Sequence, residues 1–452
     1  MTKRRDVLLL STYELGHQPL GLARPAAHLA AAGHQVTCVD LSVEHLPRQA
    51  VQQGDLIGIS IPMHTATRLG VRLAERVRRM NPRAHVCFYG LYASLNSETL
   101  LDQYADSVIG GEFESPLVDL ANGEPDAPGV QTVFGGEPFL GRQSFALPRR
   151  DLLPPLERYA RLDDGRRQKL AGYVEASRGC AHRCLHCPIT PVYGGRLRVV
   201  PAETVLADVR RLVVELGAEH ITFGDPDFFN GIKHSLRIVE ALHAELPGVT
   251  YDATIKIEHL LEHRHLLPRL RETGCLFIVS AVESIDDRVL NYLRKGHTAA
   301  DVEHALALVR HAGLVLRPTF VPFTPWTELH GYVELLEFIE DHGLIDHVDP
   351  VQLAVRLLVP RGSSLLGTEA MAGVLAPFDP DSFTYTWAHP DPRVDDLQRR
   401  VASLVEETAR SAGEAFDRIK DAALASLGRP PSARRPRGPR AHVPRLTEPW
   451  FC

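Results

Sequence analysis

Short apolar runs alternate with helical patterns along most of the chain, and this alternation limits the folds that the chain can adopt. Between residues 5 and 120 the runs are DVLLLS, VTCVDLS, LIGISIP, HVCFYG and DSVIGGE, with glycines at the turns. Strands that alternate with helices predict a doubly wound parallel sheet of the nucleotide- or cofactor-binding type. We therefore predict an α/β protein whose first domain spans residues 1–140.

The alternation resumes after residues 141–168, which are rich in Pro, Gly and Arg and are predicted to be a linker. Residues 169–370 contain six strand–helix units, the last with the strand PVQLAVRL. They predict a partial or full β/α barrel, whose reactive groups lie at the carboxyl ends of the strands. Residues 371–428 are predicted to be a helical extension with one amphipathic helix at 394–427, and 429–452 a flexible tail.

Composition excludes several classes of protein. The net charge of -6 gives no basic field for nucleic acid, so no nucleic-acid partner is expected. No run reaches the ~20 apolar residues of a membrane span, and the amino-terminal run is too short for a signal peptide. We therefore expect no membrane partner and a cytoplasmic location. Seven cysteines, three of them within eight positions, favour a metal or catalytic role over a secreted disulfide framework.

Those three cysteines, Cys180, Cys184 and Cys187, have CxxxCxxC spacing in a loop that leaves the first barrel strand. Three thiolates can bind three irons of a cuboidal cluster, whereas a closed cluster takes four ligands. The fourth iron is then open to another molecule. Two alternatives are a zinc site that uses His182 and His186, and a structural cluster closed by a distant cysteine.

This loop resembles that of the radical S-adenosylmethionine (SAM) superfamily, and the preceding domain resembles the cobalamin-binding domain that often precedes it. The resemblance implies a 4Fe–4S cluster whose open iron is chelated by SAM, and reductive cleavage of the sulfonium to give a carbon radical. Members usually have an aromatic residue before the third cysteine, where this chain has His186.

The same resemblance implies SAM ligands at the ends of later strands. Asp225 and Asp227 lie in an acid-rich turn after the second barrel strand, and Glu283 and Ser284 end the fourth. The alternatives are a helix cap or exposed turn acid for each aspartate and a buried salt bridge for Glu283.

Two arginines lie in apolar strands, where an unpaired guanidinium would be costly to bury. Arg317 and Arg356 are therefore predicted to bind a carboxylate of SAM or of the substrate, or else to form structural ion pairs.

Cobalamin is a candidate third cofactor. The DxHxxG motif that supplies the cobalt ligand in many cobalamin domains is absent, and His17 and His64, which lie in strand–helix loops, are more typical of ordinary loop residues. Several radical SAM relatives bind cobalamin without a protein ligand. The turns at Gly90 and at residues 110–114 fit the family's contacts with the corrin side chains.

A narrower resemblance rests on the stretches ERYARL, CPITPVYGGRLRVV, ITFGDPDFFNG and RPTFVPFTPWT. They are similar to the CUAEP/CCAEP-tail radical SAM proteins, which end in Cys-Cys-Ala-Glu-Pro or have selenocysteine second. We predict that Cys452 is the catalytic first half of this pair, and that an in-frame UGA was read as a stop. An ordinary terminal cysteine is the alternative.

The resemblance implies an enzyme that cleaves SAM reductively and modifies a small molecule or peptide, with flavodoxin or ferredoxin as electron donor. With cobalamin bound, the expected reaction is methylation. Without it, transfer of a 3-amino-3-carboxypropyl group to a soft acceptor such as arsenic is the alternative. The rival class is a non-enzymatic iron–sulfur redox or metalloid sensor that uses the same cysteines.

Overall fold

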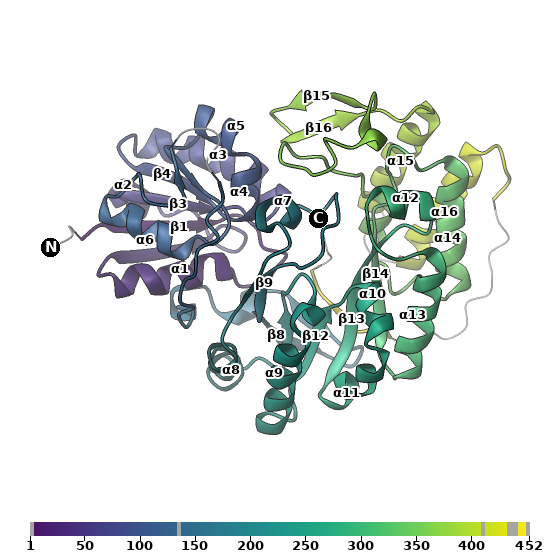
Figure 1. Ribbon diagram of the computed structural model, residues 1–452, viewed down its shortest axis with the longest axis horizontal. Helices are drawn as coiled ribbons and strands as arrows, with labels where there is room; N and C mark the ends of the chain where they lie inside the picture. Colours follow the sequence, from purple (N-terminus) through teal and green to yellow (C-terminus); the bar gives the residue numbers. More distant parts are fainter. Residues whose placement is uncertain (1–3, 133–136, 408–411, 432–441, 449–452) are drawn as a thin grey trace.

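The computed structural model describes residues 4–132, 137–407, 412–431 and 442–448. It contains two large sheets that lie side by side, each with its own helices (Figure 1). Cys452, the predicted catalytic residue of the tail, lies outside the described residues.

The first sheet has the strand order β2-β1-β3-β4-β5-β6, and all its strands except β6 are parallel. Its strands are β1 (Asp6–Ser11), β2 (Gln35–Asp40), β3 (Leu56–Ser60), β4 (His85–Tyr89), β5 (Ser107–Ile109) and β6 (Val130–Gln131). Its helices are α1 (Leu20–Ala31), α2 (Arg48–Gln53), α3 (His64–Met80), α4 (Leu91–Leu95), α5 (Ser97–Gln103) and α6 (Glu114–Asn122).

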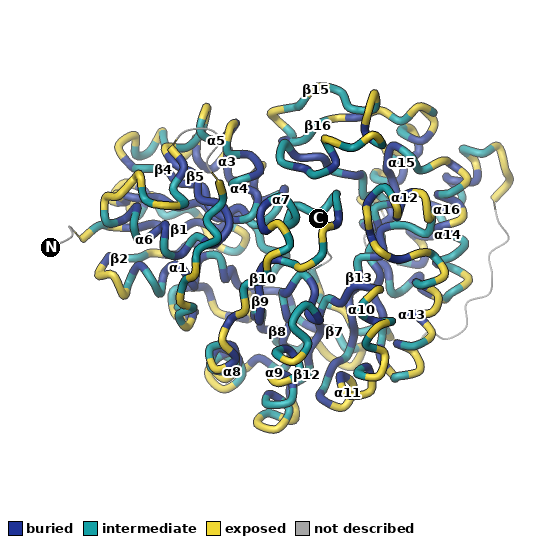
Figure 2. Tube along the Cα trace, viewed as in Figure 1, coloured by how far each residue is buried: buried dark blue, intermediate teal, exposed yellow. Residues whose placement is uncertain are grey.

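Helices cover both faces of this sheet because successive strand residues point to opposite sides. Along β1, Val7 and Leu9 pack against α1 and α6, whereas Leu8 and Leu10 pack against the α3 side. All four are buried, as expected for a central parallel strand (Figure 2). The predicted doubly wound sheet is confirmed.

The second sheet has the order β14-β13-β12-β11-β8-β7-β17, and β8 and β11 to β14 are parallel. Its strands are β7 (Arg161–Asp163), β8 (Gln168–Val174), β11 (His220–Phe223), β12 (Thr250–Thr254), β13 (Cys275–Glu283), β14 (Val315–Phe320) and β17 (Arg445–Leu446). The connecting helices are α8 (Ala202–Arg210), α9 (Ile232–Glu245), α10 (Ile257–Glu262), α11 (Leu267–Glu272), α12 (Asp287–Tyr292), α13 (Ala299–His311) and α14 (Leu329–Asp341). The sheet is an open, partial barrel, one of the two forms that the sequence predicts.

The sixth predicted strand does not form, and this prediction is wrong. Pro350–Ala354 is a 3-10 turn, and only an isolated bridge between Phe323 and Arg356 continues the sheet. Pro350 has no N–H to donate to a neighbouring strand. The side chain of Gln352 instead accepts a hydrogen bond from the Phe320 N–H of β14 (3.2 Å). This backbone N–H at the edge of the sheet thus has a hydrogen-bond partner without a sixth strand.

The predicted single helix at 394–427 is also wrong. The structure has two helices that pack against each other, α15 (Pro392–Glu407) and α16 (Ala412–Ser426). Val401 of α15 and Phe416 and Ile419 of α16 belong to the same hydrophobic core as the barrel helices. A continuous helix of this length would extend about 50 Å and carry one of the two apolar stripes away from that core.

Residues 442–448 are ordered, although the sequence predicts a flexible tail. Strand β17 pairs antiparallel with β7, and the Thr447 hydroxyl accepts a hydrogen bond from the Arg161 N–H (2.9 Å). Beyond the strand, Tyr13 of the first domain donates to Glu448 (2.9 Å). This short segment therefore contacts both domains.

The described part of the chain contains no helix that is long and apolar enough to cross a bilayer. Two small sheets complete the fold. They are β9 (Ser177–Gly179) with β10 (Leu197–Val199), next to the cysteine loop, and the hairpin β15 (Leu375–Asp379) with β16 (Thr384–Trp387).

Candidate active site

The cysteine loop follows β9 and ends at the short helix α7 (Ile189–Tyr193). Gly179 enters it with φ of +74°, and a Cβ there would lie 2.3 Å from the Arg196 carbonyl oxygen, so only glycine fits without displacing the backbone. Within the loop, the Thr190 hydroxyl donates to the Cys184 carbonyl oxygen (2.8 Å). The side chain of Asn230 donates to Cys180 Sγ (3.4 Å).

The three loop thiols are close enough to influence each other. Burial raises the pKa of Cys187 to about 12, and the nearby thiols of Cys184 and Cys180 add to that rise. A bound cluster would displace the protons of these thiols, because the iron ligand is the thiolate. Among the described residues, the other cysteines are buried in β2, β4 and β13, away from the loop. They offer no fourth ligand, so the arrangement fits a cluster with one open iron.

The candidate SAM ligand Glu283 ends β13 with a positive φ of +70°, which is unusual for a residue with a side chain. Its carboxylate lies 3.1 Å from His186 Nε2 and 3.4 Å from Lys295 Nζ. Burial alone would raise the pKa of Glu283, but Lys295 and His186 lower that pKa to about 2. His186, which departs from the family pattern, thus contacts a strand-end acid. Ser284 accepts a hydrogen bond from the Asp286 N–H (3.0 Å).

Asp225 and Asp227, which follow β11, have different partners. Asp225 accepts from the Ala176 N–H (2.9 Å) and the Ser177 hydroxyl (2.5 Å), and burial raises its pKa to about 7. Asp227 accepts from the Phe229 N–H (3.2 Å) as a helix cap. Its other oxygen faces two histidines that are described below.

The two candidate arginines form protein ion pairs, the structural alternative for both. Arg317 is 2.9 Å from Asp349. Arg356 is 2.7 Å from Asp395, and its guanidinium stacks 3.5 Å from the centre of the Trp387 ring. The structure therefore gives Arg356 no need for a carboxylate ligand, whereas the buried Nη1 of Arg317 has no hydrogen-bond partner.

A cavity of about 260 Å³ lies between the two domains. On one side it is lined by residues that follow or end strands of the first sheet, among them Glu14, Ser60 and Gly90. On the other side Glu175 and Gly224 follow β8 and β11 of the barrel. Both sheets thus present the carboxyl ends of their strands, where α/β proteins bind ligands, to one cavity.

The cavity fits a bound cofactor. Glu14 is half-buried, its Oε1 is buried without a hydrogen-bond partner, and burial together with Asp40 and Glu175 raises the pKa of its carboxyl well above the ordinary value. A neutral carboxyl in this position can donate a hydrogen bond. Gly90, with φ of +111°, brings bare backbone to the cavity. These features support the first sheet as the binding edge for cobalamin.

The two histidines considered as cobalt ligands differ in position. His17 lines the cavity, and its ring stacks on Tyr173 with 4.5 Å between centroids. His64 is held elsewhere by a 2.6 Å contact between its Nε2 and the Ser382 carbonyl oxygen. Of the two, His17 alone faces the cavity.

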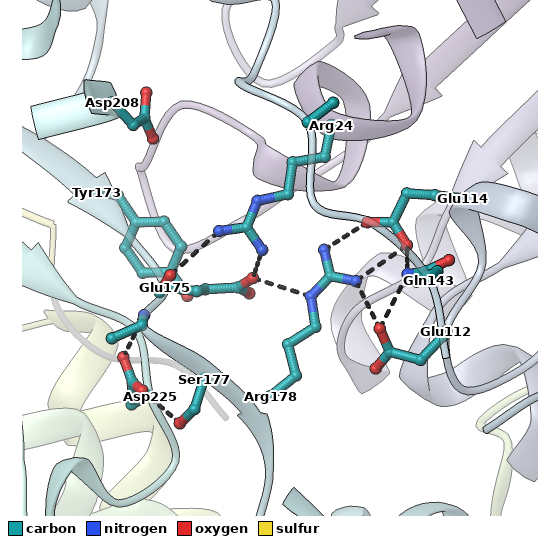
Figure 3. A network of polar contacts seen from close by, with 12 residues as sticks. Arg24, Glu112, Glu114, Gln143, Tyr173, Glu175, Ser177, Arg178, Asp208 and Asp225 are labelled. Carbon is teal, nitrogen blue, oxygen red and sulfur yellow. Dashed lines mark hydrogen bonds and ion pairs between the residues drawn. The ribbon is translucent and has the colours of Figure 1, made fainter. Parts of the chain in front are cut away.

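A buried network of charges joins the domains beside this cavity (Figure 3). Arg178, two residues before Cys180, contacts Glu114 (2.6 and 3.0 Å), Glu112 (3.3 Å) and Glu175 (3.0 Å). Arg24 of α1 pairs with the same Glu175 at 2.6 Å. The sequence does not predict this network, because its contacts between the domains join residues 64 to 151 positions apart, and only the Glu175–Arg178 contact is local.

The fold and the site define the class of the protein, and family models agree. The B12 binding domain model matches residues 7–121, and the radical SAM superfamily model matches residues 174–336. The chain contains a B12-binding domain followed by a radical SAM domain, which confirms the predicted radical SAM assignment. These domains imply a 4Fe–4S cluster and SAM as cofactors, and they support cobalamin as a third.

The chain is also similar to particular proteins and solved structures. The chain is 27% identical over 327 residues to the hopanoid C-3 methylase of Methylococcus capsulatus, a match that covers 68% of this chain and 62% of that protein. Among solved structures, it is similar to the cobalamin-dependent SAM radical enzyme OxsB with aqua-cobalamin bound (TM-score 0.69, 15% identity, 94% of this chain and 72% of that chain). TsrM from Kitasatospora setae, with cobalamin and a [4Fe-4S] cluster bound, gives a TM-score of 0.59 at 17% identity over 75% and 74% of the chains.

Acid should destabilise the protein through His17. Burial lowers the pKa of His17 to about 4, so the folded state keeps the ring neutral while the unfolded chain binds a proton below about pH 6.5. Stability is therefore lost as the pH falls from about 6.5 to about 4, by up to about 3 kcal/mol.

The variant His17→Phe retains a ring to stack on Tyr173 and should flatten this pH dependence. Urea unfolding of both proteins between pH 7.5 and 4.5 measures it. The exposed His304→Phe variant is the control, and it should follow the wild type. Parallel curves for His17→Phe and the wild type would contradict the prediction.

Proposed function

We propose that the protein is a cobalamin-dependent radical SAM methyltransferase acting on an unactivated carbon or phosphorus centre of a small molecule or peptide. The observation that carries this proposal is a cavity that faces the carboxyl ends of both sheets, beside the cysteine loop. When bound, the cluster supplies the electron that cleaves SAM, and cobalamin supplies a carrier for the methyl group.

The cysteine loop and the end of β13 are the proposed binding elements for the cluster and SAM. Cys180, Cys184 and Cys187 would bind three irons. Glu283, held ionised by Lys295 and His186, would accept hydrogen bonds from ribose hydroxyls, with Ser284 beside it.

The cavity walls would orient the reactants. The neutral Glu14 would donate a hydrogen bond to a polar group of the bound cofactor. The Arg178 network fixes the first domain to the strand that leads into the cysteine loop. It therefore fixes the distance between the carboxyl-end edges of the two sheets. Such preorganisation supports transfer between groups held on different domains.

The names of the relatives also support methyl transfer, since one is a methylase and TsrM is a radical SAM methyltransferase. Reduction of the cluster requires a one-electron donor, and we propose flavodoxin or ferredoxin, with the protein acting beside that donor in the cytoplasm.

Product analysis tests the proposal. The protein is reconstituted anaerobically with iron, sulfide and cobalamin, reduced, and incubated with SAM and a cell extract of small molecules. We expect S-adenosylhomocysteine and 5′-deoxyadenosine by mass spectrometry, with formation of S-adenosylhomocysteine dependent on cobalamin. Methylthioadenosine as the main product would instead indicate aminocarboxypropyl transfer. Reduced protein that forms none of these products would favour the sensor.

A further inference from the structure

Two imidazoles and one carboxylate meet beside the cysteine loop. His182 comes from the loop itself, Asp227 follows β11, and His259 lies in α10. Asp227 Oδ2 is 2.9 Å from His182 Nε2 and 2.7 Å from His259 Nδ1. One ligand atom from each residue lies within 4.8 Å of the other two. The three segments are far apart in sequence, so the fold brings these atoms together.

Hydrogen bonding does not account for the whole arrangement. The buried Nδ1 of His259 has no hydrogen-bond partner, even though Asp227 Oδ2 is only 2.7 Å away. The direction of a ring N–H at Nδ1 is thus poor for a hydrogen bond, although the two groups are close enough to form an ion pair. Ligands of one ion have this relation, because each directs a lone pair at the ion. With metal–ligand distances of about 2.0–2.2 Å, neighbouring ligand atoms are separated by about 3 Å.

Asp227 is held in place for this role. Its Oδ1 accepts from the Phe229 N–H (3.2 Å), which leaves Oδ2 directed at the histidines, and its side chain is 3% exposed. His182 and His259 are 17% and 15% exposed, so the site is partly open to solvent. Two imidazoles with one carboxylate suit Zn²⁺ or Fe²⁺, and a set of three protein ligands leaves further positions open.

We propose that His182, Asp227 and His259 bind a divalent transition-metal ion, separate from the iron–sulfur cluster. Because His182 lies between Cys180 and Cys184, the ion would fasten the cysteine loop to the end of β11 and to α10.

The outer contacts of His182 are compatible with an ion at its Nε2. In that state Nδ1 carries the ring proton, and Glu258 Oε2, 3.9 Å away, is the carboxylate placed to accept it. Lys256 Nζ now lies 3.2 Å from the same Nδ1 and 2.7 Å from Glu258. Lys256 would give up the first contact and keep the second, so its charge stays paired.

Zinc binding to the full-length, tag-free chain tests the proposal. The protein with its cluster assembled is incubated with Zn²⁺, desalted, and analysed for zinc and iron by mass spectrometry. We expect one retained zinc in addition to the cluster iron. Asp227→Asn and His259→Ala should each weaken zinc binding at least 100-fold, a loss larger than the roughly 10- to 100-fold typical of outer contacts, which we expect for Glu258→Gln.

The exposed His265→Ala is the matched control, because it removes a histidine from the same segment but not from the group, and it should retain the zinc. Co²⁺ gives a second readout in the Cys180→Ala/Cys184→Ala/Cys187→Ala variant, where visible bands without thiolate charge transfer are expected and should disappear on adding Asp227→Asn. Wild-type protein that retains no zinc, or equal zinc in Asp227→Asn, would overturn the proposal. Neither readout depends on SAM cleavage, so the methyltransferase proposal stands or falls separately.

Discussion

Replacing Arg178 by methionine should lower the free energy of unfolding by about 3–5 kcal/mol, the usual effect of removing one partner from a buried ion pair. Arg178 is 8% exposed and contacts Glu112, Glu114 and Glu175. Without it, these carboxylates remain buried together, with only Arg24 as a cationic partner of Glu175. Urea unfolding at pH 7 measures the loss.

The pH dependence of this loss checks its electrostatic origin. Burial alone would raise the pKa of Glu114, but the contact with Arg178 lowers that pKa to about 2 in the wild type. This stabilisation is present above the unfolded pKa of about 4.5 and is lost as the pH falls towards 2. The difference between the wild type and Arg178→Met should therefore shrink as the pH falls below about 4.5.

An exposed pair provides the control. Arg210 contacts Glu245 at 2.5 and 2.8 Å, with side chains 49% and 41% exposed, so Arg210→Met should cost less than about 1 kcal/mol. An equal effect of both substitutions would show that the interdomain network contributes no more than a surface pair.

Cys184→Ala should abolish SAM cleavage and prevent assembly of a complete cluster, because only two loop thiolates remain. Iron content and formation of 5′-deoxyadenosine measure the two effects, and both should fall to the background of the unreconstituted protein. The matched control is Cys275→Ala, which removes a buried thiol from β13. It should retain iron and activity. Full iron content in Cys184→Ala would show that another residue supplies the third ligand.

Local patterns are the part of this protein that the sequence predicts well. The apolar runs of β1 and β3 and the spacing of Cys180, Cys184 and Cys187 each depend on residues within a few positions of one another. The sixth barrel strand is a failure of the same reasoning. PVQLAVRL has a strand-like composition, but Pro350 and the side-chain contact of Gln352 with β14 favour a turn.

Contacts between distant segments could not be predicted. The pairing of His186 with Glu283 joins residues 97 positions apart. The pairing of Arg317 with Asp349 joins β14 to the segment between α14 and the turn at Pro350. In each case the sequence suggests a polar group that needs a partner, and only the fold decides whether that partner is a ligand or another side chain. The CUAEP-type tail and the role of Cys452 stay predictions.

The position of β17 bears on how the protein should be prepared. Residues 442–448 lie against β7, and Glu448 reaches Tyr13 of the first domain. A purification tag or fluorescent fusion placed just after this segment would therefore begin at the junction of the two domains and could pull β17 from its edge. Arg4, by contrast, is exposed, and the amino-terminal end of the chain lies on the side of the first domain that faces away from the second (Figure 1). An affinity handle therefore belongs at the amino terminus, and it is removed before zinc binding is measured.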